Sequence, residues 1–216
     1  MTARGIWDVV SAAIVAVAAV TMLGFYLYDR AVRVADAPER HAQDWEEWAE
    51  SGIRVGPEDA TMVVATFIDL TCPFCRTLAP VLDSVLTEFE GDAALEFHHF
   101  PLRSHEFALP AAIAAECAER QGRFIQMYHT LYALSDSVGK KPWGALAAEA
   151  GVDDIPAFEA CTQLPADAFD RIGDGLALAG RIGVIATPTV YVNGTLLNGR
   201  SVAAFRGMAE ELGVVR

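Results

Sequence analysis

The chain has 216 residues, of which 53% are hydrophobic, and this composition excludes a largely disordered protein. The length allows one globular domain with additional segments. The formal net charge of −13 argues against a nucleic-acid partner, because contacts with phosphate groups require clustered Lys and Arg.

The N-terminal part of the chain contains an uncharged, mostly apolar stretch of 20 residues, Val9 to Tyr28. As an α-helix it would extend over about 30 Å, the thickness of one hydrocarbon core. The alternative is a cleaved signal peptide, whose apolar region would be about 7–15 residues long and would end at a small-x-small site. This stretch is longer and ends in Leu27-Tyr28. We therefore predict an uncleaved signal-anchor, a single transmembrane helix within residues 1–30.

The orientation of this span is left open by the basic residues on both of its sides. A signal-anchor that exports the rest of the chain would place its cysteines where disulfides persist, so we expect the domain on the exocytoplasmic side. Residues 31–55 are predicted to form a juxtamembrane connector with a short amphipathic helix at 44–50. Gly56-Pro57 marks the start of the folded domain, residues 56–216.

The folded domain begins with a β-branched apolar run, Met62 to Ile68, which is typical of a buried strand. Apolar residues from Arg76 to Phe89 follow helical spacing. Near the C-terminus, the turn signal Asn193-Gly194 lies between the runs Pro188 to Val192 and Thr195 to Leu197, which predicts a hairpin. The expected elements are strand 62–68, helix 76–89, strand 95–100, a helical block at 104–182, a hairpin at 188–197 and a helix at 201–212.

Cys72 and Cys75 form a Cys-x-x-Cys pair between the first strand and the first helix. The first thiol then lies at a helix N-terminus, where free N–H groups and the helix dipole favour the thiolate, the form that attacks disulfides. Pro73 suits the first helical turn. Cys75, one turn further on, can resolve a mixed disulfide. A static bridge or half of a zinc site are the alternatives, but zinc ribbons use two close cysteine pairs and only one is present.

Two segments carry a resemblance to a known family. Residues 67–76 resemble the active-site motif of DsbA-like thioredoxin-domain proteins, and Thr187-Pro188-Thr189 resembles their cis-proline loop. Residues 116–124 resemble their helical insertion, so the resemblance covers about residues 54–213. It implies an α/β thioredoxin fold with a helical insertion, about 104–182, between the βαβ half and the ββα half.

The same resemblance implies roles for individual residues. Cys72 would attack, Cys75 would resolve the mixed disulfide, and the cis-proline loop would face the pair and bind the substrate backbone. The candidate substrate-binding residues are Pro73, Phe74, Thr187 and Pro188.

Two departures from the family pattern affect the expected mechanism. Relatives often place a buried acid six residues before the first cysteine, where this chain has Thr66, so Asp69 becomes the candidate proton relay. Strongly oxidising relatives carry a His between the cysteines, whereas Pro73 and Phe74 offer no side-chain hydrogen-bond donor. We therefore expect the pKa of Cys72 to lie between those of thioredoxin, near 7, and DsbA, near 3.5.

Cys117 and Cys161 lie in the helical block, and some members of the family join two such cysteines in a second, structural disulfide. Two buried free thiols are the alternative, and export of the domain favours the bridge. His98 and His99 alternate along a strand, so at most one is expected to meet the core. We expect no metal site, and without a Gly-x-Gly-x-x-Gly motif or a P-loop we expect no nucleotide cofactor.

Together these features predict a membrane-anchored thiol:disulfide oxidoreductase. The first hypothesis is a periplasmic or extracellular dithiol oxidase that introduces disulfide bonds into exported cysteine-containing proteins and is regenerated by a membrane redox partner. The alternatives are a tethered reductase or isomerase, for example for cytochrome c or metalloprotein maturation, and a non-redox substrate-binding chaperone. The direction of electron flow depends on the reduction potential.

Overall fold

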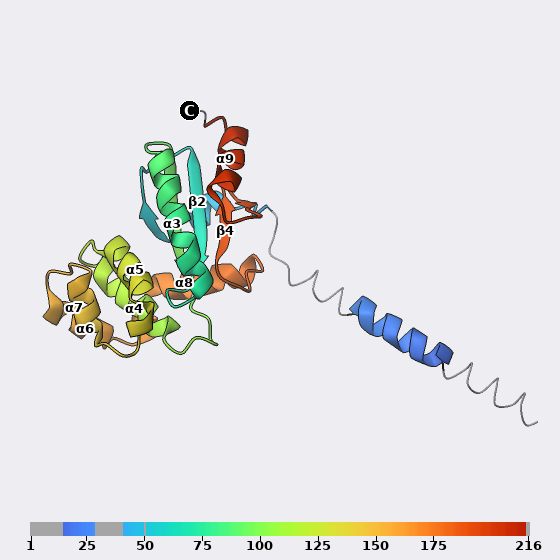
Figure 1. The fold of residues 1–216 in the computed structure, drawn as a ribbon, viewed down its shortest axis with the longest axis horizontal. Coiled ribbons are helices and arrows are strands. Elements are labelled where there is room, and N and C mark those ends of the chain that lie inside the picture. Colours follow the sequence, from blue (N-terminus) through green and yellow to red (C-terminus); the bar gives the residue numbers. More distant parts are fainter. Residues whose placement is uncertain (1–14, 29–40, 50, 215–216) are drawn as a thin grey trace, which may run out of the picture. The chain divides into compact units, whose positions relative to one another are not determined.

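The structure is a computed structural model that describes residues 15–28, 41–49 and 51–214 (Figure 1). The chain divides into two compact units, Met1–Ala37 and Pro38–Arg216. In the first unit, residues 15–28 form an α-helix with exposed side chains. The first part of the predicted span, residues 9–14, lies outside the described residues. Among the described residues, no helix has both the length and the apolar character needed to cross a membrane.

The second unit is built on a five-stranded sheet with the order β1-β3-β2-β4-β5. The central strand β2 is parallel to β3 and antiparallel to β4. At the edges, β1 pairs antiparallel with β3, and β5 pairs antiparallel with β4. All seven residues of β2 are buried, which agrees with its β-branched apolar sequence. The strands are β1 (Ile53–Val55), β2 (Met62–Ile68), β3 (Ala93–His99), β4 (Thr189–Val192) and β5 (Thr195–Leu196).

Helices cover both faces of this sheet. On one face, α3 (Pro73–Glu88) and α9 (Val202–Glu211) contact each other and pack on the larger apolar core. On the other face, α2 (Trp45–Ala49) and α8 (Asp170–Arg181) pack on a second, smaller core around Phe67. Because neither face of the sheet is open to solvent, His98 and His99 are both buried. The expectation that at most one of them meets the core is therefore wrong.

The predicted helical block divides into two parts. Four helices pack mainly on one another and form the insertion, a cluster that lies beyond one end of the sheet in Figure 1. The fifth helix, α8, instead packs across β3, and Gly175 permits this close approach because a Cβ there would lie 2.4 Å from the His99 carbonyl oxygen. The four inserted helices are α4 (Ala108–Glu119), α5 (Phe124–Ala133), α6 (Trp143–Glu149) and α7 (Ile155–Thr162).

Residues 41–49 and 51–55, which the sequence analysis placed in the connector, contribute to the compact unit. β1 pairs with β3, with Ile53 opposite Phe97. The Trp48 ring of α2 is buried against Phe67 and Tyr191. A three-residue strand without an apolar run gives no local signal, so its place in the sheet becomes visible only in three dimensions.

Candidate active site

The two cysteines lie where β2 leads into α3, and both are reduced in this structure. Cys72 is the N-cap residue of α3, with an extended backbone conformation, and Pro73 takes the first helical position. This is the arrangement that the Cys-Pro-x-Cys sequence predicts, since proline needs no hydrogen-bond partner in the first turn. Both cysteines are buried, with 3% of the Cys72 surface and 1% of the Cys75 surface exposed to solvent.

The two thiols have opposite electrostatic environments. The pKa of Cys72 is lowered to about 5, mainly by a hydrogen bond from the Cys75 side chain. Burial opposes this shift, while Thr187 and backbone donors at the helix start add to it. Burial raises the pKa of Cys75 well above its ordinary value. At neutral pH the reduced pair therefore combines a Cys72 thiolate with a protonated Cys75. A value of about 5 lies between the thioredoxin and DsbA values, as expected from the sequence.

The loop before β4 faces this pair. Its Thr187–Pro188 peptide bond is cis, and the Thr187 carbonyl oxygen lies 3.6 Å from Cys72 Sγ. The pairing of Thr189 with Phe67 fixes the start of β4 beside the end of β2. The site residues assigned to the cis-proline loop and to the Cys-x-x-Cys motif are thus brought together, although 115 positions separate Cys72 from Thr187.

Thr187 belongs to the cis-proline loop and lies close to Cys72. Its side chain is buried and contributes to the lowered pKa of Cys72, although its hydroxyl makes no hydrogen bond of ordinary length to the described residues. Thr187→Val removes this hydroxyl at nearly constant shape, so the pKa of Cys72 should rise by roughly one pH unit at most. Thiolate absorbance of the reduced protein against pH measures this. Thr189→Val is the control, because its hydroxyl donates to the Ala186 carbonyl; equal titration curves for Thr187→Val and wild type would contradict the assignment.

Asp69, the candidate proton relay, is fully buried but turned toward the surrounding loops. One carboxylate oxygen accepts hydrogen bonds from the backbone N–H and the hydroxyl of Thr71. The other accepts from the Leu102 N–H at 3.1 Å and pairs with His105 Nδ1 at 2.7 Å. These contacts join the active-site loop to residues 102–105, as a residue that positions the loop would.

The backbone of Asp69 is held as well. Its carbonyl oxygen accepts from the Cys72 N–H at 3.0 Å and from the Tyr132 hydroxyl at 3.2 Å. Tyr132 belongs to α5, so the inserted helices contact the active-site loop directly. Cys72, Pro73, Arg76 and Tyr132 also line a cavity of about 240 Å³ beside the pair.

Asp69→Asn tests the two roles against each other. The buried carboxylate would be lost while His105 and two N–H groups remain, so the free energy of unfolding should fall by roughly 2–4 kcal/mol. Denaturant unfolding of the oxidised protein measures this loss. For a positioning residue, the pH profile of mixed-disulfide resolution should keep the wild-type shape. A displaced profile with unchanged stability would instead identify Asp69 as the relay.

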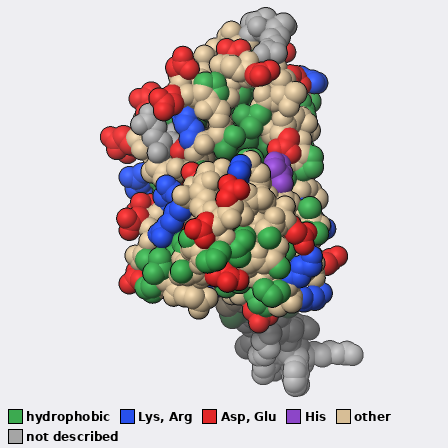
Figure 2. Space-filling model, turned by 90° about the vertical axis from the view of Figure 1, so that its left-hand side faces the viewer, with side chains coloured by type: hydrophobic (Ala, Val, Ile, Leu, Met, Phe, Trp, Pro, Cys, Tyr) green, Lys and Arg blue, Asp and Glu red, His purple; other side chains and the backbone are tan. Residues whose placement is uncertain are grey.

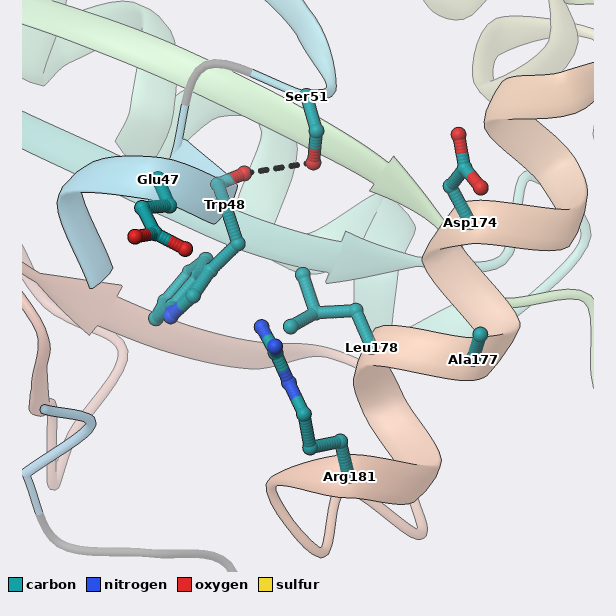
Figure 3. A pocket seen from close by; sticks show the side chains of 7 residues that line it. All are labelled: Glu47, Trp48, Ser51, Asp174, Ala177, Leu178 and Arg181. Atoms are coloured by element: carbon teal, nitrogen blue, oxygen red, sulfur yellow. Dashed lines mark hydrogen bonds between the residues drawn. The ribbon is translucent and has the colours of Figure 1, made fainter. Parts of the chain in front are cut away.

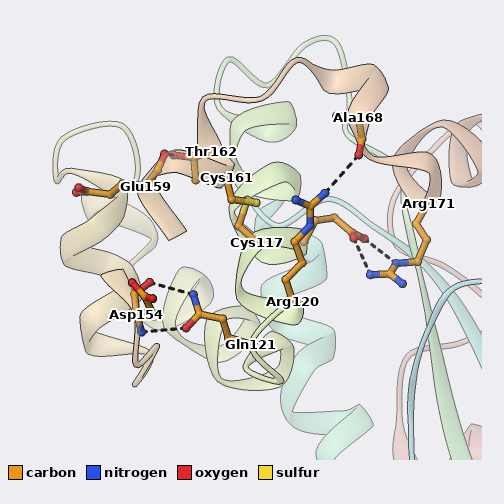
Figure 4. The surroundings of a disulfide bond; sticks show 10 residues. Cys117, Arg120, Gln121, Asp154, Glu159, Cys161, Thr162, Ala168 and Arg171 are labelled. Atoms are coloured by element: carbon orange, nitrogen blue, oxygen red, sulfur yellow. Dashed lines mark hydrogen bonds and ion pairs between the residues drawn. A yellow bond between two sulfur atoms is a disulfide. The ribbon is translucent and has the colours of Figure 1, made fainter. Parts of the chain in front are cut away.

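The inserted helices contain the disulfide Cys117–Cys161, which joins α4 to α7 with a Cα–Cα distance of 5.8 Å (Figure 4). This is the pairing implied by the resemblance. The preceding residue, Glu116, is buried and binds Arg171 of α8 through both carboxylate oxygens and His99 of β3 through one. Burial alone would raise the pKa of Glu116, but His99 and Arg171 together lower it to about 2. One ion-pair cluster thus connects the insertion, α8 and the sheet.

A further cavity of about 330 Å³ lies between α2 and α8, and none of its lining residues belongs to the redox site. Figure 3 shows Arg181 extending from α8 toward Trp48 and Leu178, with Ser51 bonded to the Trp48 carbonyl. Among the described residues, no group of three or more His, Cys, Asp or Glu side chains is arranged to hold a metal ion.

Three residues near the site were not singled out from the sequence: His105, Tyr132 and Arg200. His105 and Tyr132 contact Asp69, which is 36 and 63 positions away. The Arg200 guanidinium lies 5.6 Å from the centre of the Phe74 ring. No local pattern marks such residues, because each gains its role from a contact between distant segments.

Comparisons with known proteins agree with this geometry. A thioredoxin family model (Thioredoxin_4) matches residues 49–210. The Na(+)/H(+) antiporter NhaA 1 of Mycolicibacterium gilvum is 34% identical over 141 residues, which are 64% of this chain and 23% of the antiporter. The match therefore spans less than a quarter of the length of that curated relative.

Solved structures share the fold. Oxidised BdbD from Bacillus subtilis aligns with a TM-score of 0.65 and 18% identity, covering 82% of this chain and 97% of BdbD. The thiol-disulfide exchange protein α-DsbA2 from Wolbachia pipientis aligns with a TM-score of 0.64 and 17% identity, covering 78% and 93% of the two chains. The predicted α/β fold with its helical insertion is confirmed.

Proposed function

Because the chain belongs to the thioredoxin family, and its fold and paired cysteines make it a thiol:disulfide oxidoreductase, we propose that it is a dithiol oxidase for exported proteins. The observation that carries this proposal is the environment of Cys72, whose pKa is lowered to about 5. Stabilisation of the thiolate favours the reduced dithiol state, and a protein that favours its reduced state is an oxidant.

The proposed reaction begins with the Cys72–Cys75 disulfide. A substrate thiolate attacks Cys72 Sγ, the bond between the two cysteines breaks, and Cys75 leaves with the electron pair and takes up a proton. A second substrate thiolate then attacks the substrate sulfur of the mixed disulfide and releases Cys72 as a thiolate. The substrate loses two electrons to the pair, which a membrane redox partner would reoxidise.

The surroundings of Cys72 suit an unfolded cysteine-containing chain. Phe74 and Ile185 are 59% and 66% exposed, and they flank Cys72 and the cis-proline loop in sequence. Exposed apolar side chains of this size are typical of binding surfaces when they gather. We propose that Pro73, Phe74, Thr187 and Pro188 contact the substrate near its reacting sulfur.

The membrane anchor within residues 1–30 and the connector that follows it remain part of the proposal. Their support is the 20-residue uncharged stretch, whose length suits one span. The resemblance to part of an antiporter fits a redox domain that works at a membrane surface. We propose that the domain lies on the exocytoplasmic side, periplasmic or extracellular.

An oxidation assay tests the proposed function. The full chain, oxidised and held in nonionic detergent, is mixed with a reduced, unfolded protein that contains several cysteines. We expect disulfides to form in the substrate while one Cys72–Cys75 disulfide is consumed for each one made. Faster reduction of an oxidised substrate by the dithiol form would favour the reductase or isomerase alternative. An effect retained after Cys72 and Cys75 are both replaced by Ser would favour the chaperone alternative.

A further inference from the structure

Arg200 brings a positive charge to the redox site from a distant part of the chain. It lies in the segment between β5 and α9. Its guanidinium carbon is 5.6 Å from the centre of the exposed ring of Phe74, the residue just before Cys75. A guanidinium over an aromatic ring leaves N–H groups at its edge available. These donors have the fork geometry that binds a carboxylate with two hydrogen bonds.

The cavity beside Arg200 reaches the cis-proline loop. It has a volume of about 280 Å³, and Arg200 is the single charged residue among the described residues that line it. No carboxylate of the cavity itself therefore competes for the guanidinium. The lining residues are Pro188, Thr189, Val190, Leu196, Leu197, Asn198, Gly199 and Arg200.

Arg200 also lacks an acidic partner elsewhere in the described part of the chain. Ion pairs hold other arginines, including Arg54, Arg171 and Arg206, whereas the contact found for Arg200 is with Phe74. The protein is strongly acidic overall, and on the face drawn in Figure 2 basic side chains lie among widely spread acidic ones. A guanidinium without a carboxylate partner, in contact with the residue between the two cysteines, is free to bind an external partner.

The second arginine near the pair differs in this respect. Arg76 lines the cavity that contains Cys72, where its guanidinium donates to the Ser135 hydroxyl and Asp136 lies in the same lining. An acidic residue therefore lines the same cavity as Arg76. This cavity is thus a poorer place for an acidic group than the one beside Arg200.

We propose that Arg200 is a specificity-determining residue that binds a carboxylate of the substrate, so that the oxidase prefers cysteines with Asp or Glu close by in sequence. This inference rests on the proposed function. The substrate class is an acidic cysteine-containing peptide segment, placed with its sulfur at Cys72, its backbone along the cis-proline loop and its acidic side chain at the guanidinium edge.

Three synthetic dithiol peptides that differ in one residue, two positions from the first cysteine, test the proposal. This residue is Glu, Gln or Lys. The oxidised full chain in nonionic detergent is mixed with each peptide, and the second-order rate constant of peptide oxidation is measured at low ionic strength. We expect the Glu peptide to react about two- to fivefold faster than the Gln peptide, the range for one exposed ion pair. Salt should reduce this ratio.

Variants assign the preference to a residue. Arg200→Gln should bring the Glu-to-Gln ratio close to one, and Arg200→Lys should restore part of it. Arg76→Gln should change the ratio less. Arg181→Gln, which removes an equal charge at the cavity between α2 and α8, should retain the wild-type ratio.

The outcomes separate the two proposals. Equal rates for the Glu and Gln peptides would overturn the role of Arg200 while leaving the oxidase function in place. An equal loss of preference in Arg181→Gln would also overturn it, because net charge would then be the cause. No oxidation of any peptide would contradict the proposed function and the inference with it.

Discussion

Replacing Cys75 by Ser should trap the enzyme in mixed disulfides through Cys72, and replacing Cys72 by Ser should trap none. Cys72 is the thiol with the lowered pKa, about 5, at the start of α3. Cys75 is buried and its pKa is raised, so it attacks poorly from solution but can resolve a bond formed next to it. Both variants should lose turnover by at least about a thousandfold, as expected when a member of a catalytic unit is removed.

Mass spectrometry of the trapped complexes measures this result. The reduced variants are incubated with an oxidised peptide, alkylated in acid and digested, and the cysteine that carries the peptide is identified. The Cys72→Ser, Cys75→Ser double variant is the control, since Cys117 and Cys161 are already joined. A peptide attached to Cys75 in the Cys72→Ser variant, at a rate similar to that of Cys72, would reverse the assignment of nucleophile.

Loss of the Cys117–Cys161 disulfide should give the largest change in stability. The bridge closes a segment with a separation of 44 positions, and the loop-entropy relation gives roughly 4 kcal/mol for a loop of that size. Cys117→Ala, Cys161→Ala should therefore lower the free energy of unfolding by about that amount. The redox pair contributes nothing to this difference if both Cys72 and Cys75 are replaced by Ser in all proteins compared.

Urea unfolding at equilibrium measures the change. Chemical reduction of the bridge in the same background is the matched control, because it opens the loop without removing the sulfur atoms from the packed insertion. The two treatments should agree within about 1 kcal/mol. A loss below about 1 kcal/mol in both would show that the ion-pair cluster around Glu116 and the apolar contacts hold the insertion without the bridge.

The sequence predicts the parts of this molecule that depend on local pattern. The apolar run of β2, the helical spacing of α3 and the Asn193-Gly194 turn each encode an element, and the Cys-Pro-Phe-Cys segment marks the helix start. Asn193 and Gly194 both adopt positive φ, as such a turn requires. The resemblance to DsbA-like proteins added the pairing of the cis-proline loop with the cysteines, which no local pattern contains.

The parts that could not be predicted depend on contacts between distant segments. Asp69 could be noticed as the nearest carboxylate, but its partners Leu102 and His105 belong to another loop. The burial of His98 depends on α2, which covers the second face of the sheet: the Trp48 ring lies 5.9 Å from that of His98. Arg200 approaches Phe74 only because the chain returns to the site after β5. The pKa expected for Cys72 from the sequence therefore took no account of the positive charge of Arg200.

The equilibrium of the Cys72/Cys75 pair with glutathione tests the central claim most directly. The fraction of oxidised protein is measured by acid quenching and alkylation over a range of glutathione redox ratios. A dithiol oxidase with a Cys72 pKa of about 5 should have a reduction potential between about −270 and −120 mV, clearly above the thioredoxin end. A potential at or below about −270 mV would contradict the oxidase account and identify the protein as a reductase.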